Sequence, residues 1–167
     1  MGINPRYKTR PLFRNQIKTN KSLSVKDYLK KQANKQVILD YSQLRIACYH
    51  LLNTSLKKRS IVASSSYTIY DMVNIIINAG HKPYLVDIDK NSLCPSLREL
   101  TNLALEKKVN AIIYTHLHGY NINLKNLAQI CSKNNILLIE DCAQSLWCKD
   151  YFEAIDLPGS YGDAALF

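Results

Sequence analysis

Short apolar runs alternate with amphipathic segments along most of the chain. Runs rich in Ile, Val and Leu, typical of buried strands, occur at residues 36–41, 59–66, 82–89, 110–119 and 136–141. Segments with helical spacing of their apolar residues lie between them, at residues 45–56, 70–80, 96–108 and 124–135. Strands that are almost continuously apolar, separated by helices of about ten residues, indicate βαβ units and a parallel sheet covered on both faces. We therefore predict an α/β fold.

The two ends of the chain differ from this middle part. Residues 24–35 predict a short, mostly polar helix that begins after a capping serine, Ser24. Residues 163–167, DAALF, read as the beginning of another strand. We place a boundary between an N-terminal arm, residues 1–36, and an α/β domain, residues 37–167.

Composition indicates one domain of ordinary size in a reducing compartment. The chain has 167 residues, of which 47% are hydrophobic, enough to bury a core. It has no run of about 18 apolar residues, and its start has no apolar signal-peptide core. We therefore expect no membrane span and a cytoplasmic location. The cysteines form no CxxC pair, which fits reduced, buried thiols at Cys48, Cys94, Cys131, Cys142 and Cys148.

The positive charge is confined to the arm. Residues 1–36 contain ten Lys or Arg and one acid, Asp27, whereas residues 37–167 contain twelve of each sign. Such an arm can contact phosphates or an anionic surface, but it has no recognisable nucleic-acid-reading motif. We expect a solvated or partner-packed extension, and nucleic acid is an unlikely partner.

Polar residues gather where the predicted strands end. These stretches are SSSYT (64–68), DID (87–89), HLHG (116–119) and EDCAQ (140–144). In an open parallel sheet the carboxyl ends of the strands meet at one edge, where ligands bind. The chain has neither GxGxxG nor GxxxxGK[ST], so a Rossmann or P-loop nucleotide site is poorly supported. His116 and His118 lack a third ligand in register, and we predict no metal site.

Taken in order, five blocks resemble a known family. The blocks are IVASSSYT, NIIINAGHKPYLVDID, NAIIYTHLHG, NILLIEDCAQS and GSYGDAALF. Their order and spacing resemble the N-terminal half of the DegT/StrS-type sugar aminotransferases, which are fold type I enzymes dependent on pyridoxal 5'-phosphate (PLP). The resemblance covers residues 42–167. It implies a three-layer sandwich with a mostly parallel sheet, the large PLP-binding domain of that family.

The resemblance assigns roles to particular residues. The family aspartate matching Asp141 pairs with the protonated pyridine nitrogen of PLP, and the glutamine matching Gln144 lies near the phenolic oxygen. From the residues alone, Asp141 could also be a helix cap. Glu140 points to the opposite side of its strand, and we assign it no chemistry.

Two positions depart from the family pattern at the cofactor. Leu44 stands where the phosphate-binding turn has a glycine, and Arg45 could supply charge there instead. Ile69 stands where an aromatic residue normally stacks on the pyridine ring.

The resemblance also sets an expectation about activity. In the family the Schiff-base lysine follows a few residues beyond the position of Phe167, so no catalytic residue is assigned within this chain. The resemblance implies nucleotide-sugar and glutamate substrates and a homodimer of full-length chains. We expect the chain alone to be inactive. The alternatives are an inactive relic, or an unrelated doubly wound domain with a non-catalytic binding role.

Overall fold

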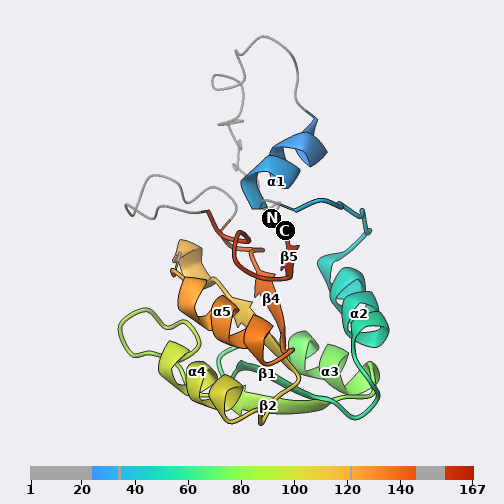
Figure 1. Ribbon diagram of the computed structural model, residues 1–167. Coiled ribbons are helices and arrows are strands. Elements are labelled where there is room, and N and C mark those ends of the chain that lie inside the picture. The colour runs from blue at the N-terminus through green and yellow to red at the C-terminus, as the bar shows by residue number, and fades with distance from the viewer. Residues whose placement is uncertain (1–23, 34, 121, 146–156) are drawn as a thin grey trace, which may run out of the picture.

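A parallel sheet of five strands runs through the protein (Figure 1). The computed structural model describes residues 24–33, 35–120, 122–145 and 157–167. The strand order across the sheet is β2-β1-β3-β4-β5. The strands are β1 (Ile61–Ser65), β2 (Lys82–Val86), β3 (Ala111–Thr115), β4 (Leu137–Asp141) and β5 (Ala164–Leu166). Every pairing between neighbouring strands is parallel, which confirms the predicted sheet.

Helices cover the sheet on both faces, which makes three layers (Figure 1). The helices are α1 (Val25–Ala33), α2 (Leu44–Ser55), α3 (Tyr70–Asn78), α4 (Leu97–Leu105) and α5 (Lys125–Lys133), with a short 3-10 turn at Leu117–Gly119. Helices α2 and α3 pack on one face of the sheet, and α4 and α5 pack on the other.

Successive side chains of each strand point to opposite faces of the sheet, and so each strand contributes to both layers of the core. In β1, Val62 packs among the residues of α2 and α3, while Ala63 packs among those of α4 and α5. The partner strand β3 follows the same rule, because Val62 pairs with Ala111 and Ala63 with Ile112. Both faces of each central strand are therefore buried, which is why the sequence showed continuous apolar runs.

The order in which strands are added changes side between β1 and β3. The chain leaves β1 through α3 to β2, and then returns through α4 to β3 on the other side of β1. In a doubly wound sheet, ligands bind outside the carboxyl ends of the strands at such a switch point. Residues 64–68 and 116–119, at the ends of β1 and β3, flank this point, and residues 87–89 and 140–144 lie at the ends of the next strands outward.

Predicted helix boundaries are confirmed at several points. Ser24 precedes α1 and its hydroxyl accepts the N–H of Asp27. Ser96 caps α4 in the same way, accepting from Glu99. Gly80 follows α3 with a φ of 84°, a left-handed conformation that suits glycine.

The prediction of a strand at residues 36–41 is wrong. This segment starts with a bend at Gln36 and belongs to no strand, and none of its main-chain groups pairs with another described residue. An apolar run becomes a strand only where its main-chain groups pair with a neighbouring strand, and among the described residues this segment pairs with none of the five strands.

The expectation for the cysteines is confirmed for four of the five. Cys48, Cys94, Cys131 and Cys142 are unpaired and buried, and Cys148 lies outside the described residues. Within the described ranges, no helix has the length and apolar character that crossing a bilayer requires. The arm boundary at residue 36 stays a prediction, because residues 1–23 lie outside the described part.

Candidate active site

Asp141 is a buried carboxylate at the carboxyl end of β4. Its side chain accepts hydrogen bonds from the Thr115 hydroxyl (3.3 Å) and from the Ala143 N–H (3.2 Å). Burial raises the pKa of the Asp141 carboxyl, and these two hydrogen bonds only partly oppose that effect. No described Lys or Arg forms an ion pair with Asp141. The site therefore holds an acid whose negative charge has no strong cationic partner.

Two more polar side chains face the same way as Asp141. Asp141 and Ile139 share the sheet face covered by α2 and α3, because they are two residues apart in β4. By the same alternation Thr115 and Ser64 lie on this face, at the ends of β3 and β1. The Ser64 hydroxyl is fully buried and has no hydrogen-bond partner among the described residues. A group bound here would find a hydroxyl without a hydrogen-bond partner and a carboxylate without an ion pair among the described residues.

Arg45 and Ile69 lie at the N-termini of the two helices on this face. Arg45 is the second residue of α2, and its guanidinium forms an ion pair with Asp71 of α3. Ile69 directly precedes α3 and is 60% exposed. Both positions lie at the same edge of the sheet as Asp141. The first turn of α3 lies there because α3 follows β1, and the ion pair of Arg45 with Asp71 holds the first turn of α2 beside it. The Arg45 charge is thus already paired.

Gln144 lies in the turn after β4 and is exposed. Its Oε1 accepts a hydrogen bond from the main-chain N–H of His118 (3.0 Å), which ties the ends of β4 and β3 together. His118 has a φ of 53°, and its ring lies beside that of Tyr67. The structure therefore gives Gln144 a local structural contact at this edge of the sheet.

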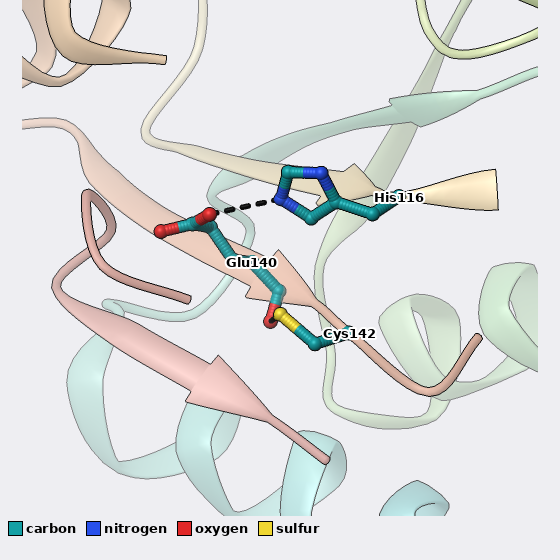
Figure 2. Close-up of side chains that lie close together, drawn as sticks. All are labelled: His116, Glu140 and Cys142. Atoms are coloured by element: carbon teal, nitrogen blue, oxygen red, sulfur yellow. Dashed lines mark hydrogen bonds and ion pairs between the residues drawn. The ribbon is translucent and has the colours of Figure 1, made fainter. Parts of the chain in front are cut away.

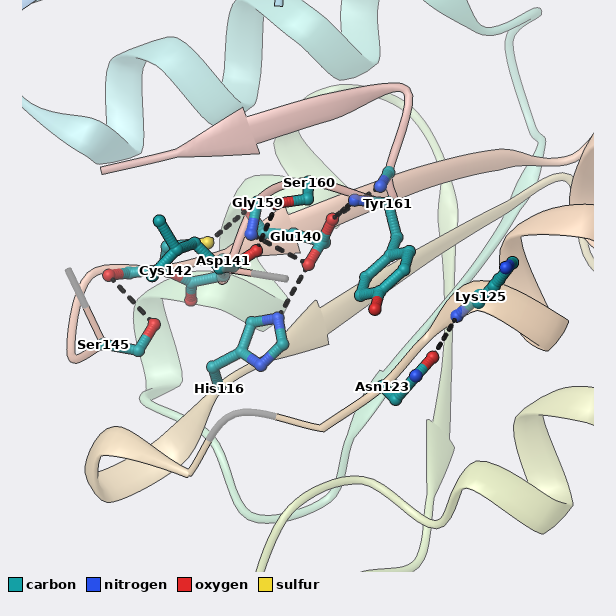
Figure 3. A network of polar contacts seen from close by, with 12 residues as sticks. His116, Asn123, Lys125, Glu140, Asp141, Cys142, Ser145, Gly159, Ser160 and Tyr161 are labelled. Carbon is teal, nitrogen blue, oxygen red and sulfur yellow. Dashed lines mark hydrogen bonds and ion pairs between the residues drawn. The ribbon is translucent and has the colours of Figure 1, made fainter. Parts of the chain in front are cut away.

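Glu140 lies on the opposite face of β4, as predicted, but it is the centre of a polar network (Figure 3). Its carboxylate accepts hydrogen bonds from the N–H groups of Gly159 (3.0 Å) and Tyr161 (2.7 Å), and from that of Gly162. His116 Nε2 lies 2.8 Å from the same carboxylate. Burial alone would raise the Glu140 pKa, but the bonds from His116, Gly162 and Gly159 outweigh it and hold the pKa below its usual value.

The network explains how β5 is held beside β4. Residues 159–162 form the turn that enters β5, and three of their N–H groups converge on one carboxylate. Sequence reasoning missed this role because it assigned Glu140 no chemistry. The signal available was an acid within an otherwise apolar run, since buried acids are normally paired or hydrogen-bonded.

His116, Glu140 and Cys142 come close enough together to suggest a metal site (Figure 2). Their potential ligand atoms all lie within 4.8 Å of one another. However, the Glu140 carboxylate already accepts four hydrogen bonds, and burial raises the pKa of the Cys142 thiol, which disfavours the thiolate. The hydrogen-bonded arrangement satisfies this carboxylate without an ion.

The residues present fit one end of PLP and not the other. A buried carboxylate with no cationic partner suits the protonated pyridine nitrogen, which would supply a positively charged donor. At the phosphate end, Leu44 opens α2 where a glycine would let main-chain N–H groups approach, and Arg45 is engaged by Asp71. Thr115 and Ser64 were not predicted as site residues, because a Thr or Ser at a strand end carries no distinctive sequence signal.

A doubly wound α/β domain with a buried acid at its ligand-binding edge defines a class of small-molecule-binding domains found in many enzymes. The comparison with protein families is more specific. Residues 46–167 match the DegT/DnrJ/EryC1/StrS aminotransferase family, and the chain belongs to this family.

Similar curated proteins include a sugar-nucleotide synthase and a putative cyclitol aminotransferase, both of which are much longer than this chain. The chain is 26% identical over 102 residues to GDP-perosamine synthase of Vibrio cholerae, covering 61% of this chain and 27% of that protein. It is 30% identical over 108 residues to a putative L-glutamine:3-amino-2,3-dideoxy-scyllo-inosose aminotransferase of Streptoalloteichus tenebrarius, covering 64% and 24%. The chain thus spans about a quarter of the length of these relatives.

Solved structures confirm the fold. A GDP-4-keto-6-deoxymannose-3-dehydratase with bound GDP-perosamine has a TM-score of 0.68 at 20% identity, covering 81% of this chain and 36% of that one. An Escherichia coli GDP-4-keto-6-deoxy-D-mannose-3-dehydratase with bound hydrated PLP has a TM-score of 0.60 at 21% identity, covering 68% and 31%. Both share the PLP-transferase fold with this chain.

Proposed function

We propose that this chain forms the cofactor-side part of a PLP-dependent aminotransferase of nucleotide-sugar biosynthesis. The single observation that carries the proposal is Asp141, a buried carboxylate without a cationic partner among the described residues, on the face covered by α2 and α3. Burying an ionised carboxylate without a cationic partner costs stability, and a bound cofactor with a positively charged group would offset that cost.

Each site residue has a physical task in this proposal. When bound, PLP supplies a ring that accepts electrons from an amino-acid Cα. Asp141 would accept a hydrogen bond from the ring nitrogen and hold its proton there, because a neighbouring carboxylate raises the pKa of that nitrogen. Thr115 orients the carboxylate through its hydroxyl. Ile69 would cover the ring with an aliphatic surface, and Gln144 would lie near the phenolic oxygen.

The substrates follow from the relatives. Proteins named for GDP-perosamine and for an aminated cyclitol support a keto-sugar nucleotide as the amino acceptor, with an amino acid such as glutamate as donor. The resemblance further implies a homodimer of family-length chains. The four described cysteines, all unpaired, support a reducing cytoplasm as the location.

A second candidate is a binding module without catalysis. The ion pair between Arg45 and Asp71, together with Leu44 at the start of α2, favours it, because neither leaves a ready phosphate site. The resemblance places the Schiff-base lysine beyond Phe167, so we expect no transamination by the 167-residue chain in either case.

PLP titration of the wild type and an Asp141→Asn variant tests the role of Asp141. We expect the variant to bind PLP at least about tenfold more weakly, a loss of about 1.4 kcal/mol. Asp87→Asn is the matched control, because Asp87 follows β2 at the same edge but is exposed. Equal affinities for the wild type and the Asp141 variant would refute the proposed contact with the pyridine nitrogen.

A further inference from the structure

The chain enters β1, β2, β3 and β4 through segments that are rich in Lys and Arg. The cations are residues 57–59 before β1, Lys82 at the start of β2, residues 107 and 108 before β3, and Lys133 at the end of α5, before β4. All seven of these residues are exposed. Within these four described entries to the strands, the one acid is Glu106. We refer to the seven cations as the basic edge.

Main-chain hydrogen bonds hold the four entries together at the amino edge of the sheet. The Arg59 N–H donates to the Gly80 carbonyl (2.8 Å), which joins the entries to β1 and β2. Asn110 joins the others, because its N–H donates to Ile61 of β1 (2.8 Å) and its carbonyl accepts from Leu137 of β4 (3.0 Å). Neighbouring strands lie about 4.8 Å apart, so the cations form one row in the order β2, β1, β3, β4.

Most of the charge of the basic edge is not balanced within the described part of the chain. Lys108 forms an ion pair with Glu106, and Lys58 donates to the Ala79 carbonyl at the end of α3 (3.3 Å), a favourable place for a cation. The other five cations form no ion pair with any described residue. Like charges in one row repel each other, and an anionic partner would relieve that repulsion.

Acids gather at the opposite, carboxyl edge of the sheet. Asp87, Asp89 and Asp141 lie at strand ends, and Asp71 and Glu99 lie in the first turns of α3 and α4. The balanced composition of residues 37–167 thus conceals a separation of charge along the strands. An anionic surface would attract the basic edge and repel the edge that holds Asp141.

Exposed aliphatic side chains flank the basic edge on both sides. Ile77 in the last turn of α3 is 51% exposed, and Leu105 at the end of α4 is 57% exposed. These two helices cover opposite faces of the sheet. Lys beside aliphatic residues suits a bilayer surface, where ammonium groups meet lipid phosphates and apolar groups enter the headgroup layer. Nucleic-acid surfaces more often use Arg and stacking aromatics, whereas six of these seven cations are Lys.

We propose that the basic edge binds the surface of a membrane that contains anionic phospholipids. The five cations without an ion pair lie against lipid phosphates, and Ile77 and Leu105 enter the headgroup layer. The contact uses the edge opposite Asp141 and leaves the candidate active site facing away from the bilayer. The inference does not depend on PLP or on the proposed function.

Co-sedimentation of the 167-residue chain with lipid vesicles tests this contact. The vesicles contain phosphatidylcholine alone, or phosphatidylcholine with about 30% phosphatidylglycerol, in about 0.1 M salt. We expect the chain to bind the anionic vesicles at least about tenfold more tightly than the neutral ones.

Two variants that remove equal charge assign this binding to one edge. Lys57→Gln/Lys82→Gln/Lys133→Gln should weaken binding to the anionic vesicles at least about tenfold. The matched control is Lys90→Gln/Arg98→Gln/Lys125→Gln, which removes three exposed cations from the carboxyl edge and should weaken binding less than about threefold. Circular dichroism confirms that each variant is folded.

A further pair of variants distinguishes a bilayer from a nucleic acid. Ile77→Gln/Leu105→Gln should weaken vesicle binding at least about threefold without changing retention on a DNA duplex, because only the bilayer accepts aliphatic groups. Ile46→Gln/Leu93→Gln is the control, since both side chains are 40% exposed and lie at the carboxyl edge.

Three results would overturn the proposal. The first is a wild type that binds anionic and neutral vesicles equally. The second is an equal loss of vesicle binding in the two triple variants, which would assign the contact to charge in general. The third is tighter binding to the DNA duplex than to anionic vesicles at equal phosphate concentration, which would assign the basic edge to nucleic acid.

Discussion

Glu140 and Asp141 are adjacent in β4, face opposite sides of the sheet, and have pKa values displaced in opposite directions. Four hydrogen bonds around Glu140 lower its pKa, whereas burial without enough compensation raises that of Asp141. Glu140 is satisfied by hydrogen bonds within the fold, whereas Asp141 has no ion pair among the described residues and is the acid that our proposed function assigns to a cofactor.

At this residue scale, replacing Glu140 by Gln should destabilise the protein by about 3–5 kcal/mol. The amide NH₂ of Gln is a donor and would face the N–H groups that now converge on the carboxylate, so buried donors lose their acceptor. Urea unfolding measures the change. Glu106→Gln, at an exposed position, is the control and should change the free energy of unfolding by less than about 0.5 kcal/mol. A Glu140 variant as stable as this control would contradict the role of the network.

The same two acids predict a pH dependence. The folded-state pKa of Glu140 lies below its usual 4.5, so its stabilisation is fully present above pH 4.5 and is lost as pH falls through the folded-state value. The pKa of Asp141 lies above its usual 3.8, so its ionisation destabilises the fold, and Asp141→Asn should raise the urea midpoint at neutral pH.

Urea midpoints measured from about pH 7 down to about pH 3 check both signs. The wild type should lose stability below pH 4.5 more steeply than Glu140→Gln does. Parallel curves for the two proteins, or an Asp141→Asn variant that is less stable at neutral pH, would show that the assignment of the two acids is wrong.

At the scale of elements, the turn into β5 depends on a glycine. Gly159 has a φ of 90°, and a Cβ there would lie 2.8 Å from Phe167 Cζ and 2.9 Å from Ala165 Cβ. Gly159→Ala should therefore cost roughly 2–4 kcal/mol, combining backbone strain with a steric clash. Thermal or urea unfolding gives the value.

Gly80→Ala is a matched control for that experiment. Gly80 also has a left-handed φ, 84°, but its added Cβ would meet only the flexible side chain of Lys58 at 3.1 Å. The cost there should be about 1 kcal/mol, from backbone strain alone. Equal costs at the two glycines would mean that packing against Phe167 and Ala165 contributes nothing.

At the scale of the whole molecule, the two core layers share one sheet and should unfold together. Leu52 lies in the layer of α2 and α3, and Leu100 lies in the layer of α4 and α5; both are fully buried. Replacing either by Ala should cost about 2–5 kcal/mol and lower a single transition. Circular dichroism and tyrosine fluorescence should report the same midpoint in each variant. Separate midpoints in either one would show that the layers are independent units.

The sequence by itself determined the α/β class, the parallel sheet and the edge of the sheet where the polar strand ends gather. Short apolar runs such as the one ending at Asp141 are typical of strands buried on both faces, and segments of helical spacing between them favour parallel crossovers. Motif blocks with fixed order and spacing identified the family. The resemblance of these blocks assigned Asp141 to the pyridine nitrogen, and that assignment stays a prediction.

Only the tertiary structure decided which polar groups meet and which strands find partners. The four donors around Glu140 come from β3 and from the turn before β5, far from β4 in sequence, so no local pattern foretells them. The pairing of Arg45 with Asp71 likewise depends on how α2 and α3 pack. Residues 36–41 have the composition of a strand, but a strand needs a neighbour, and hydrogen bonding to a neighbour is a property of the folded arrangement and not of the segment.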